Sequence, residues 1–319
     1  GTLFDAGELI SQPRRRSASV KVKVSDDKVT GVGGVVLWGP MLDNLNLVGV
    51  ADQRLLRPIG PGGYTGGECY RALVEILLAG GDFLSDRSLL DGPTQQLRGA
   101  HVLPSHPTMF RFCGGADFGR VQKAAAVNRT MLARAWASGA GPTGGIVTVD
   151  PDATLVDTYG PQKEGSKFSY RGEVGLSPLI GVCGETGDVL AIRARGGNAH
   201  PGRDNAGFIR ECVSAIPKPV RETTNLWVRV DSAGYQHAVF NTAEELGAVF
   251  TVTAPQRSNV KAKVRELATN PDTQWVPALA GEAKHGSEVA ETPFVMGQGK
   301  SRRMLRMIVR RQRTSAGDQ

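Results

Sequence analysis

Cysteine is scarce in this sequence, and its spacing excludes the common cysteine-based sites. Cys69, Cys113, Cys183 and Cys212 are scattered without a C-x-x-C pair, so neither a zinc site nor a disulfide framework is indicated. The five histidines likewise lack metal-ligand spacing such as H-E-x-x-H. We therefore expect buried, reduced thiols.

Long apolar segments are also missing. No apolar run approaches the roughly 18 residues of a membrane-spanning helix. The first residues lack the charged n-region and the apolar core of a signal peptide. These absences predict a cytoplasmic protein without a membrane partner.

What the chain does have is ordinary globular composition with a basic excess. Its 319 residues are 40% hydrophobic and 22% charged, and this length suggests about two domains. The 38 Lys and Arg residues outnumber the 31 Asp and Glu residues, which gives a net charge of +7. Such an excess favours a polyanionic partner, and nucleic acid is the first candidate.

A basic segment precedes the first helical pattern. Pro13–Arg16 is a basic cluster, and Val20–Val24 alternates valine with lysine, which predicts a half-exposed strand. The lysines either guard a solvated strand edge against pairing or form an arm that contacts phosphates. Both interpretations stay open.

The residue pattern changes from helical to β-rich after a glycine-rich linker. Apolar residues at helical spacing run through 41–48, 68–78 and 121–136. The stretch 139–145 then combines several glycines with a proline, which is typical of a linker. We therefore predict a mainly helical domain over residues 1–144.

Two β-branched stretches that end in acids organise the rest of the chain. One runs through Gly145–Val156 and carries Asp150 and Asp152, and the other is Leu226–Asp231. Two carboxylates delivered side by side by strand ends would hold a hard divalent cation such as Mg²⁺. The plainer alternative is that each acid forms a turn or caps the next helix.

The order of predicted elements indicates an α/β (α+β) fold with an RNase H-like mixed sheet. Strands are expected at 146–150, 153–158, 172–183 and 188–194, the last two joined by a short hairpin loop. A helix at 205–216, a strand at 226–231, a helix at 236–246 and a strand at 249–253 follow. In that fold the first and fourth strands are neighbours, which brings Asp150 or Asp152 beside Asp231.

An ordered set of segments resembles DDE transposases of bacterial insertion sequences, of the cut-and-paste kind with a β-rich insertion in the catalytic domain. The likeness covers about Leu73 to Thr253. The matching segments are Leu77–Asp86, Leu103–Thr108, Val149–Val156, Gln162–Gly165, Ser177–Leu179, Arg195–Ala199 and Val228–Tyr235.

The resemblance implies metal-dependent phosphoryl transfer, that is, strand cleavage and strand transfer at the element ends. Its first acid falls on Asp152 or Asp150 and its second on Asp231, and Asp152 fits the motif better. The cofactor would be Mg²⁺ or Mn²⁺, and two ions would assist an in-line displacement. The partners would be terminal inverted repeats and target DNA, held by a homodimer on paired ends in the nucleoid.

The same resemblance divides the chain into three parts. Residues 1–144 would be a DNA-binding or leader domain, 145–255 the first part of the catalytic core, and 256–319 the start of the insertion. The family's third acid, a Glu on a later helix, has no counterpart. Glu282, Glu288 and Glu291 lie in Gly- and Thr-containing sequence without a helical setting. We therefore expect a C-terminally truncated chain that is inactive alone.

Two other functions stay open from the residues. Asp150-x-Asp152-x-Thr154 also matches the nucleophile loop of haloacid-dehalogenase-like phosphatases, although a hairpin follows where that fold needs a crossover helix. A non-catalytic DNA-binding remnant is the other alternative.

Basic residues near the expected active face are candidates for DNA contact, although such residues are often simply solvated. Trp275 is either a core residue or a base-stacking side chain. The candidates for DNA contact are Lys163, Lys167, Arg193, Arg195, Arg203, Arg302, Arg303, Arg306, Arg310 and Arg311.

Overall fold

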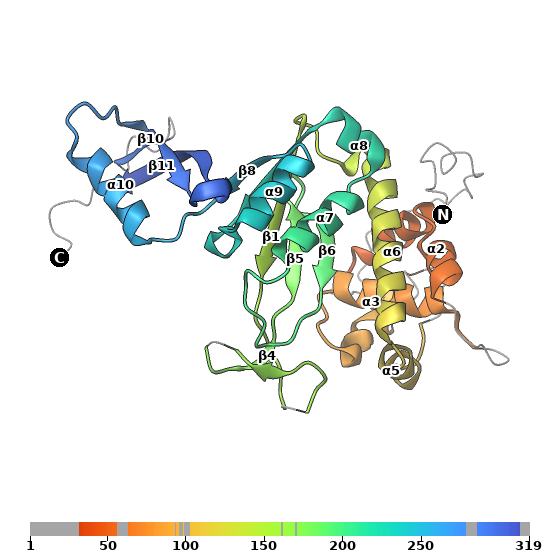
Figure 1. Cartoon of the computed structure of the whole chain (residues 1–319). Helices are drawn as coiled ribbons and strands as arrows, with labels where there is room; N and C mark the ends of the chain where they lie inside the picture. Colours follow the sequence, from red (N-terminus) through yellow and green to blue (C-terminus); the bar gives the residue numbers. More distant parts are fainter. Residues whose placement is uncertain are drawn as a thin grey trace.

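The computed structural model shows a helical part followed by a mixed sheet with flanking helices (Figure 1). It describes residues 32–55, 63–92, 94–95, 98, 103–160, 162–169, 171–278 and 286–312. The basic cluster Pro13–Arg16 and the predicted strand Val20–Val24 lie outside these residues. Within the described residues, no helix is long and apolar enough to cross a membrane.

The helical part has its own hydrophobic core, which includes Leu47, Ile76, Met109 and Val127. Helix α3 is its centre and begins with a capping box, in which Thr65 and Glu68 each accept a hydrogen bond from the other's backbone N–H. Its elements are α1 (Val35–Asn44), α2 (Leu47–Arg54), α3 (Gly66–Leu78), η1 (Leu84–Leu90), α5 (His106–Gly114), α6 (Phe118–Ala135) and the π-helical turn η2 (Trp136–Ala140).

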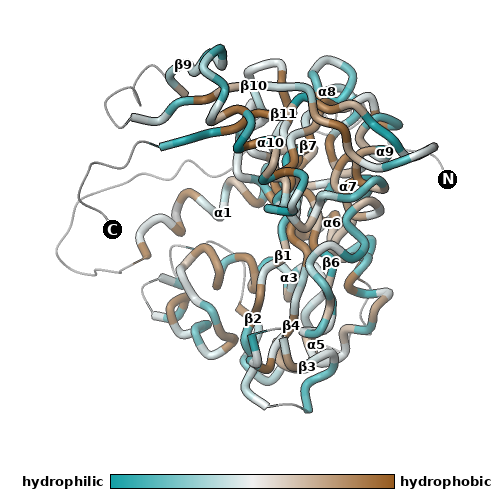
Figure 2. The backbone as a smooth tube through the Cα atoms, turned by 60° about the vertical axis from the view of Figure 1, so that its left-hand side comes forward, coloured by the Kyte–Doolittle hydropathy of each residue, from teal (hydrophilic) through white to brown (hydrophobic). Residues whose placement is uncertain are grey.

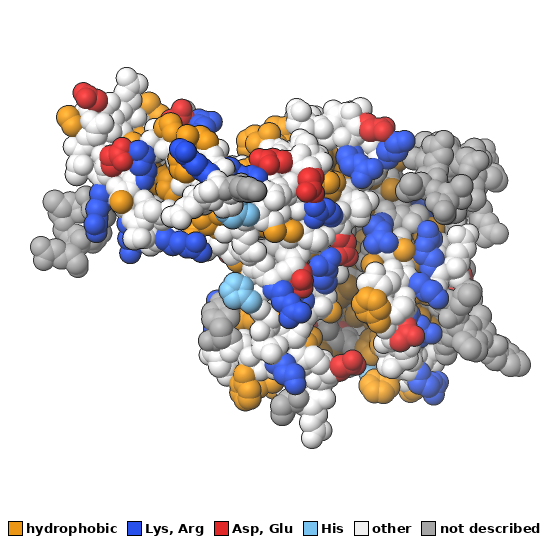
Figure 3. Space-filling view, in the orientation of Figure 1, with side chains coloured by type: hydrophobic (Ala, Val, Ile, Leu, Met, Phe, Trp, Pro, Cys, Tyr) orange, Lys and Arg blue, Asp and Glu red, His pale blue; other side chains and the backbone are white. Residues whose placement is uncertain are grey.

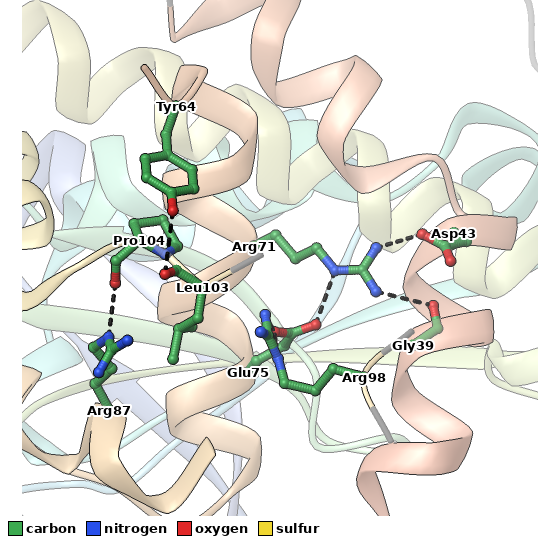
Figure 4. A network of polar contacts seen from close by, with 9 residues as sticks. All are labelled: Gly39, Asp43, Tyr64, Arg71, Glu75, Arg87, Arg98, Leu103 and Pro104. Carbon is green, nitrogen blue, oxygen red and sulfur yellow. Dashed lines mark hydrogen bonds and ion pairs between the residues drawn. The ribbon is translucent and has the colours of Figure 1, made fainter. Parts of the chain in front are cut away.

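A buried ion network ties three segments of the helical part together (Figure 4). Glu75 is 1% exposed and accepts from Arg71 Nε at 2.8 Å and from Arg98 Nε at 2.7 Å. Arg71 also pairs with Asp43 and donates to the Gly39 carbonyl oxygen on α1. Because each buried charge has an opposite partner, the network fixes α1, α3 and the segment around Arg98 in one arrangement.

Helix α6 connects the helical core to the sheet core. Val127 is fully buried among the helices, whereas Leu132 and Trp136 pack with the sheet. Trp136 Nε1 donates to Asp188 Oδ2 at 2.7 Å, beside the β5–β6 hairpin. One continuous helix therefore belongs to both cores.

The sheet has five strands in the order β6-β5-β1-β7-β8, with β5 and β6 antiparallel and β7 and β8 parallel to their neighbours. This order confirms the predicted RNase H-like mixed sheet. The parallel strands β7 and β8 follow helices in the chain, whereas no helix of the described residues lies between β1 and its antiparallel neighbour β5. The haloacid-dehalogenase-like phosphatase alternative would need a crossover helix directly after β1. The strands are β1 (Ile146–Ala153), β5 (Leu179–Cys183), β6 (Val189–Arg193), β7 (Asn225–Val230) and β8 (Val249–Val252).

Helices α7 (Asn205–Ala215) and α9 (His237–Glu245) cover one face of this sheet (Figure 1). Their buried faces meet the inward residues of the strands, and Figure 2 shows hydrophobic stretches along these central elements. Phe208 of α7, Val149 of β1 and Val228 of β7 are fully buried there. The short helix α8 (Lys218–Thr223) leads from α7 to β7.

The predicted β segments need two corrections. A single strand, β1, continues through Asp150 and Asp152, so these acids lie within the strand and not after it. The predicted strand 172–183 is two strands in different sheets, because Ser177 and Pro178 separate them. Its first half joins a small sheet of order β2-β4-β3, made of β2 (Val156–Asp157), β3 (Lys167–Phe168) and β4 (Val174–Leu176).

The last described segment packs onto α9. Arg303 pairs with Glu244 at 2.8 Å and donates to Asn241, and Phe294 and Met296 join the sheet core. The hydrophobic core of the sheet therefore extends beyond residue 255, where we predicted the start of the insertion. The limits of the three predicted domains remain predictions. The elements are α10 (Ser258–Thr269), β9 (Val276–Pro277), β10 (Ser287–Met296), η5 (Gly299–Ser301) and β11 (Arg303–Gln312).

Candidate active site

The pairing of β1 with β7 brings two of the predicted acids to the same place. The parallel register aligns Val149 with Val228. Asp152, near the end of β1, and Asp231, directly after β7, each lie three residues beyond this aligned pair. Strand alternation places both on the face opposite α7, because their neighbours Pro151 and Val230 are buried. Both acids are exposed at the carboxyl ends of adjacent parallel strands.

Each of these carboxylates is oriented by a backbone N–H. Asp152 Oδ1 accepts from Ala153 N at 2.7 Å, and Asp231 Oδ1 accepts from Ala233 N at 3.0 Å. Asp231 is therefore also the N-cap of η3 (Ser232–Gly234), the plainer role foreseen for it. Within the described part of the chain, neither Oδ2 atom has a protein hydrogen-bond partner, so both remain free to bind a cation.

Asp150 has a different environment, because Arg229 on β7 occupies its carboxylate. Arg229 Nε lies 3.2 Å from Asp150 Oδ2, and its Nη2 donates to the same oxygen. The hydrogen bond from Arg229 to this carboxylate raises the pKa of the guanidinium. No pattern in the sequence indicates this pair, since it depends on the β1–β7 register.

A second pair of residues missed in the sequence lies at the beginning of β1. Glu185, on the β5–β6 turn, accepts from Thr148 Oγ1 at 2.6 Å and from Thr148 N at 2.7 Å. Burial would raise the pKa of Glu185, but its hydrogen bonds, chiefly those from Thr148 and also those from its own backbone and Cys183, together hold the pKa below its usual value. Glu185 thus satisfies the backbone N–H of Thr148 near the start of β1.

The loop after β6 supports the two acid-bearing strand ends. Arg195 Nε donates to the Ser177 carbonyl oxygen at 2.8 Å, and its Nη1 donates to that of Arg203 at 2.9 Å. The Gln236 amide then donates to the carbonyl oxygens of Gly202 at 2.9 Å and Ala233 at 2.7 Å. These contacts join the small sheet to the turn that Asp231 caps.

The predicted DNA-contact residues divide into solvent-facing and internally paired groups. Lys163, Lys167, Arg203 and Arg302 are exposed, and Arg203 lies 3.5 Å from Asp204. Contact of these residues with DNA remains a prediction.

The paired group has protein partners instead. Arg193 binds Glu211 at 2.7 Å and lies over Phe208, while Arg195 forms the loop contacts above. On β11, the four arginines contact neighbouring residues of the fold. Arg303 pairs with Glu244, Arg306 with Glu291, Arg310 with Ser287, and Arg311 with Glu288 and the Trp275 ring.

A third acid does not join Asp152 and Asp231 among the described residues, where no group of three potential metal ligands occurs. Glu288 and Glu291 are in the ion pairs of β10 with β11, and Glu282 lies outside the described residues. Truncation and inactivity of the chain remain predictions.

Comparison with known proteins identifies the family. The sequence profile described as "Transposase DDE domain group 1" matches residues 13–319. No curated protein shows significant sequence similarity to the chain.

Two solved structures show weak similarity to the fold. A piggyBac transposase in a synaptic complex with hairpin DNA is 12% identical, over 86% of this chain and 60% of that one, with a TM-score of 0.35. The Mos1 mariner paired end complex with Mn is 11% identical, over 62% and 64%, with a TM-score of 0.25. The chain thus spans less than two thirds of either protein, and the fold assignment rests on the strand order. Because the family profile matches almost the whole sequence, the chain belongs to the DDE transposases of domain group 1.

Proposed function

We propose that this protein is a DNA transposase of an insertion sequence, and that Asp152 and Asp231 are the first two acids of its metal site. The observation that carries this proposal is the parallel β1–β7 register, which pairs Val149 with Val228, three residues before each of the two acids. Family membership supplies the reaction class, which is phosphoryl transfer during strand cleavage and strand transfer.

The donor atoms fit Mg²⁺ or Mn²⁺. Both cations prefer oxygen ligands and are commonly held by one or two carboxylates, with water and substrate phosphate completing the shell. Asp152 and Asp231 would each use Oδ2, since Oδ1 is held by a backbone N–H. When bound, the metal would activate the attacking oxygen and stabilise the leaving oxygen. The protein's own contribution is to hold the two carboxylates in fixed orientations.

Asp150 has a supporting role in this proposal. Its ion pair with Arg229 crosses from β1 to β7 two residues before the acids and helps to keep the strands in register. Arg229 is 59% exposed, so the pair adds little stability by itself. Because no described acid joins Asp152 and Asp231 in a group of three potential ligands, a third acid would have to come from elsewhere.

The proposed partners are the terminal inverted repeats of the element and its target DNA, with two copies of the protein on paired ends. The net charge of +7 supports a polyanionic partner. Such a protein would act on DNA in the cytoplasm, in association with the nucleoid.

Mn²⁺ titration followed by electron paramagnetic resonance tests the site without requiring activity. Asp152→Asn and Asp231→Asn are each expected to weaken Mn²⁺ binding by at least about tenfold, since even outer-shell partners of a metal ligand commonly contribute that much. Asp150→Asn is the matched control, with the same chemical change on the same strand, and should change affinity far less.

Two outcomes would contradict the proposal. Equal loss of Mn²⁺ binding in all three variants would make Asp150 a ligand, and retention of binding in Asp152→Asn would remove the central acid. Metal-dependent cleavage of duplex DNA by the purified chain would separately disprove its predicted inactivity. Specific DNA binding without metal binding would instead favour the non-catalytic remnant.

A further inference from the structure

Gln236 follows the turn that Asp231 caps and is the N-cap residue of α9, but its side chain does not cap the helix. A capping side chain accepts a hydrogen bond from the first turn of its own helix, whereas the Gln236 amide donates away from α9. Its Nε2 donates to the Ala233 carbonyl oxygen at 2.7 Å and to that of Gly202 at 2.9 Å. The side chain therefore joins the turn after β7 to the loop after β6.

Ala233 links this amide to the carboxylate of Asp231. The Ala233 N–H donates to Asp231 Oδ1 at 3.0 Å, and the carbonyl oxygen of the same residue accepts from Gln236. A rotation of the Ala233 backbone would therefore move the N–H that holds Oδ1, and Oδ2 would turn with it. Gln236 is thus separated from a predicted metal ligand by a single residue.

The backbone of Gln236 is anchored in the sheet core. Its carbonyl oxygen accepts from Val239 N at 3.1 Å and from Phe240 N at 3.2 Å. The side chains of both residues are buried in that core. The amide consequently extends from a fixed position towards the turn.

The loop after β6 approaches the amide so closely that a side chain does not fit at Gly202. A Cβ there would lie 2.3 Å from Gln236 Nε2 and 2.5 Å from the Ala233 carbonyl oxygen. The Gly202 N–H donates to His200 Nδ1 at 3.1 Å, and Arg195 holds the same loop through the carbonyl oxygen of Arg203. The loop is therefore a fixed support for Gln236.

The charged side chains near this turn are paired with one another. Figure 3 shows acidic and basic side chains side by side over α7 and α9, and two pairs there are Arg193–Glu211 and Arg210–Glu245. Among the residues that the structure describes, Asp231 has no ion-pair partner. Its orientation depends on the backbone hydrogen bond from Ala233.

We propose that Gln236 is a positioning residue of the metal site, which holds Ala233 so that Asp231 directs Oδ2 towards Asp152. The inference rests on the proposed function, because it requires Asp231 to be a metal ligand. Loss of a hydrogen-bonding partner behind a metal ligand commonly weakens metal binding by about 10–100-fold. A residue that only anchored the loop would lower the stability of the fold without acting specifically through Asp231.

Mn²⁺ binding to the whole 319-residue chain, followed by electron paramagnetic resonance, tests the proposal. Gln236→Met keeps the length of the side chain and removes both N–H donors, so we expect about tenfold weaker Mn²⁺ binding. Gln122→Met is the matched control, because Gln122 is exposed on α6, and it should bind Mn²⁺ like the parent. Thermal denaturation in EDTA measures the stability of each variant without metal.

A double-mutant cycle separates positioning of Asp231 from a general effect on the fold. Adding Gln236→Met to Asp231→Asn should cause no further loss, because the carboxylate that it positions is already gone. Adding it to Asp152→Asn should still weaken binding about tenfold, since Asp231 remains. If Gln236→Met does not fold, Gln236→Asn serves in the same cycle, because its amide is one methylene too short to reach both carbonyl oxygens.

Parent-like Mn²⁺ affinity of Gln236→Met, or equal losses in the Asp231→Asn and Asp152→Asn backgrounds, would overturn the proposal. Parent-like affinity of Asp231→Asn alone would disprove the metal site itself. Failure of the proposed function and failure of this inference are thereby distinguished.

Discussion

At the scale of single residues, Glu75 is the side chain on which the helical part depends most. Its two oxygens form ion pairs with two buried arginines, Arg71 and Arg98. Removing one partner of a buried ion pair leaves an uncompensated charge, so Glu75→Gln should lower the free energy of unfolding by about 3–5 kcal/mol. Urea denaturation measures this difference.

The control for this prediction is the same substitution at an exposed ion pair. Glu291 pairs with Arg306 on the surface, where both side chains are at least 60% exposed. Glu291→Gln should therefore change stability by less than about 1 kcal/mol. Equal effects of the two substitutions would show that the buried network is not a main contributor to stability.

The cysteines differ in environment, which predicts their order of alkylation. Burial raises the pKa of Cys212 to about 12, and Cys69 and Cys183 are also buried. Cys113 is exposed, although partial burial of its thiol raises its pKa as well. Because only the thiolate reacts, iodoacetamide should modify Cys113 first, at a rate that rises with pH through the alkaline range.

Mass spectrometry of the native chain identifies the modified residue. Modification of Cys212 as fast as Cys113 at neutral pH would contradict the packing of α7 on the sheet. The expectation of burial was wrong for Cys113, because this residue lies on an exposed side of α5, which the sequence pattern did not reveal.

At the scale of elements, strand β5 comes close to its covering helix α7 at Gly181. A Cβ at this position would lie 2.2 Å from Cys212 Sγ and 3.3 Å from Phe208. Gly181→Ala should therefore push α7 away and destabilise the protein by about 1–3 kcal/mol, as overpacked cores do. Adding Cys212→Ala should restore part of this loss, because it removes the sulfur atom.

Thermal denaturation of the two single variants and the double variant checks this coupling. Strict additivity would mean that Gly181 and Cys212 do not compete for the same space. The Gly181→Ala change alone should leave the helical core intact, since that core contains neither residue.

The sequence predicted most elements of the sheet, because their periodicity is strong. α7, β7, α9 and β8 match their predicted ranges to within one or two residues at each end. The sequence-based prediction was wrong around Asp150, where β1 continues through Pro151. It was also wrong around Ser177, where the single predicted strand is two strands that belong to different sheets. Both errors arose because pairing partners far along the chain decide where a strand continues.

The candidate site was predictable to a similar degree. Two strand ends and the predicted topology put Asp150 or Asp152 beside Asp231, and the family resemblance favoured Asp152. The register supports the proximity of Asp152 and Asp231. The Asp150–Arg229 pair and the internal partners of Arg193 and Arg195 did not follow, since side-chain pairing between distant elements leaves no periodic signal in one sequence.

At the scale of the whole molecule, helix α6 joins the helical part to the sheet, because its residues pack in both hydrophobic cores. It supplies Val127 to one core and Leu132 to the other, and Trp136 of η2, directly after it, is buried in the second core. We therefore expect a single unfolding transition in urea that is the same by tryptophan fluorescence and by circular dichroism. Two separated transitions would show that the two cores unfold independently.

The most direct test of the central claim is a crystal structure of the chain grown with Mn²⁺, with anomalous diffraction recorded to locate the metal. The account predicts an anomalous peak between Asp152 Oδ2 and Asp231 Oδ2, within coordination distance of both atoms. Asp150 should still be paired with Arg229. A peak at Asp150, or strands in a register that separates Asp152 from Asp231, would contradict it.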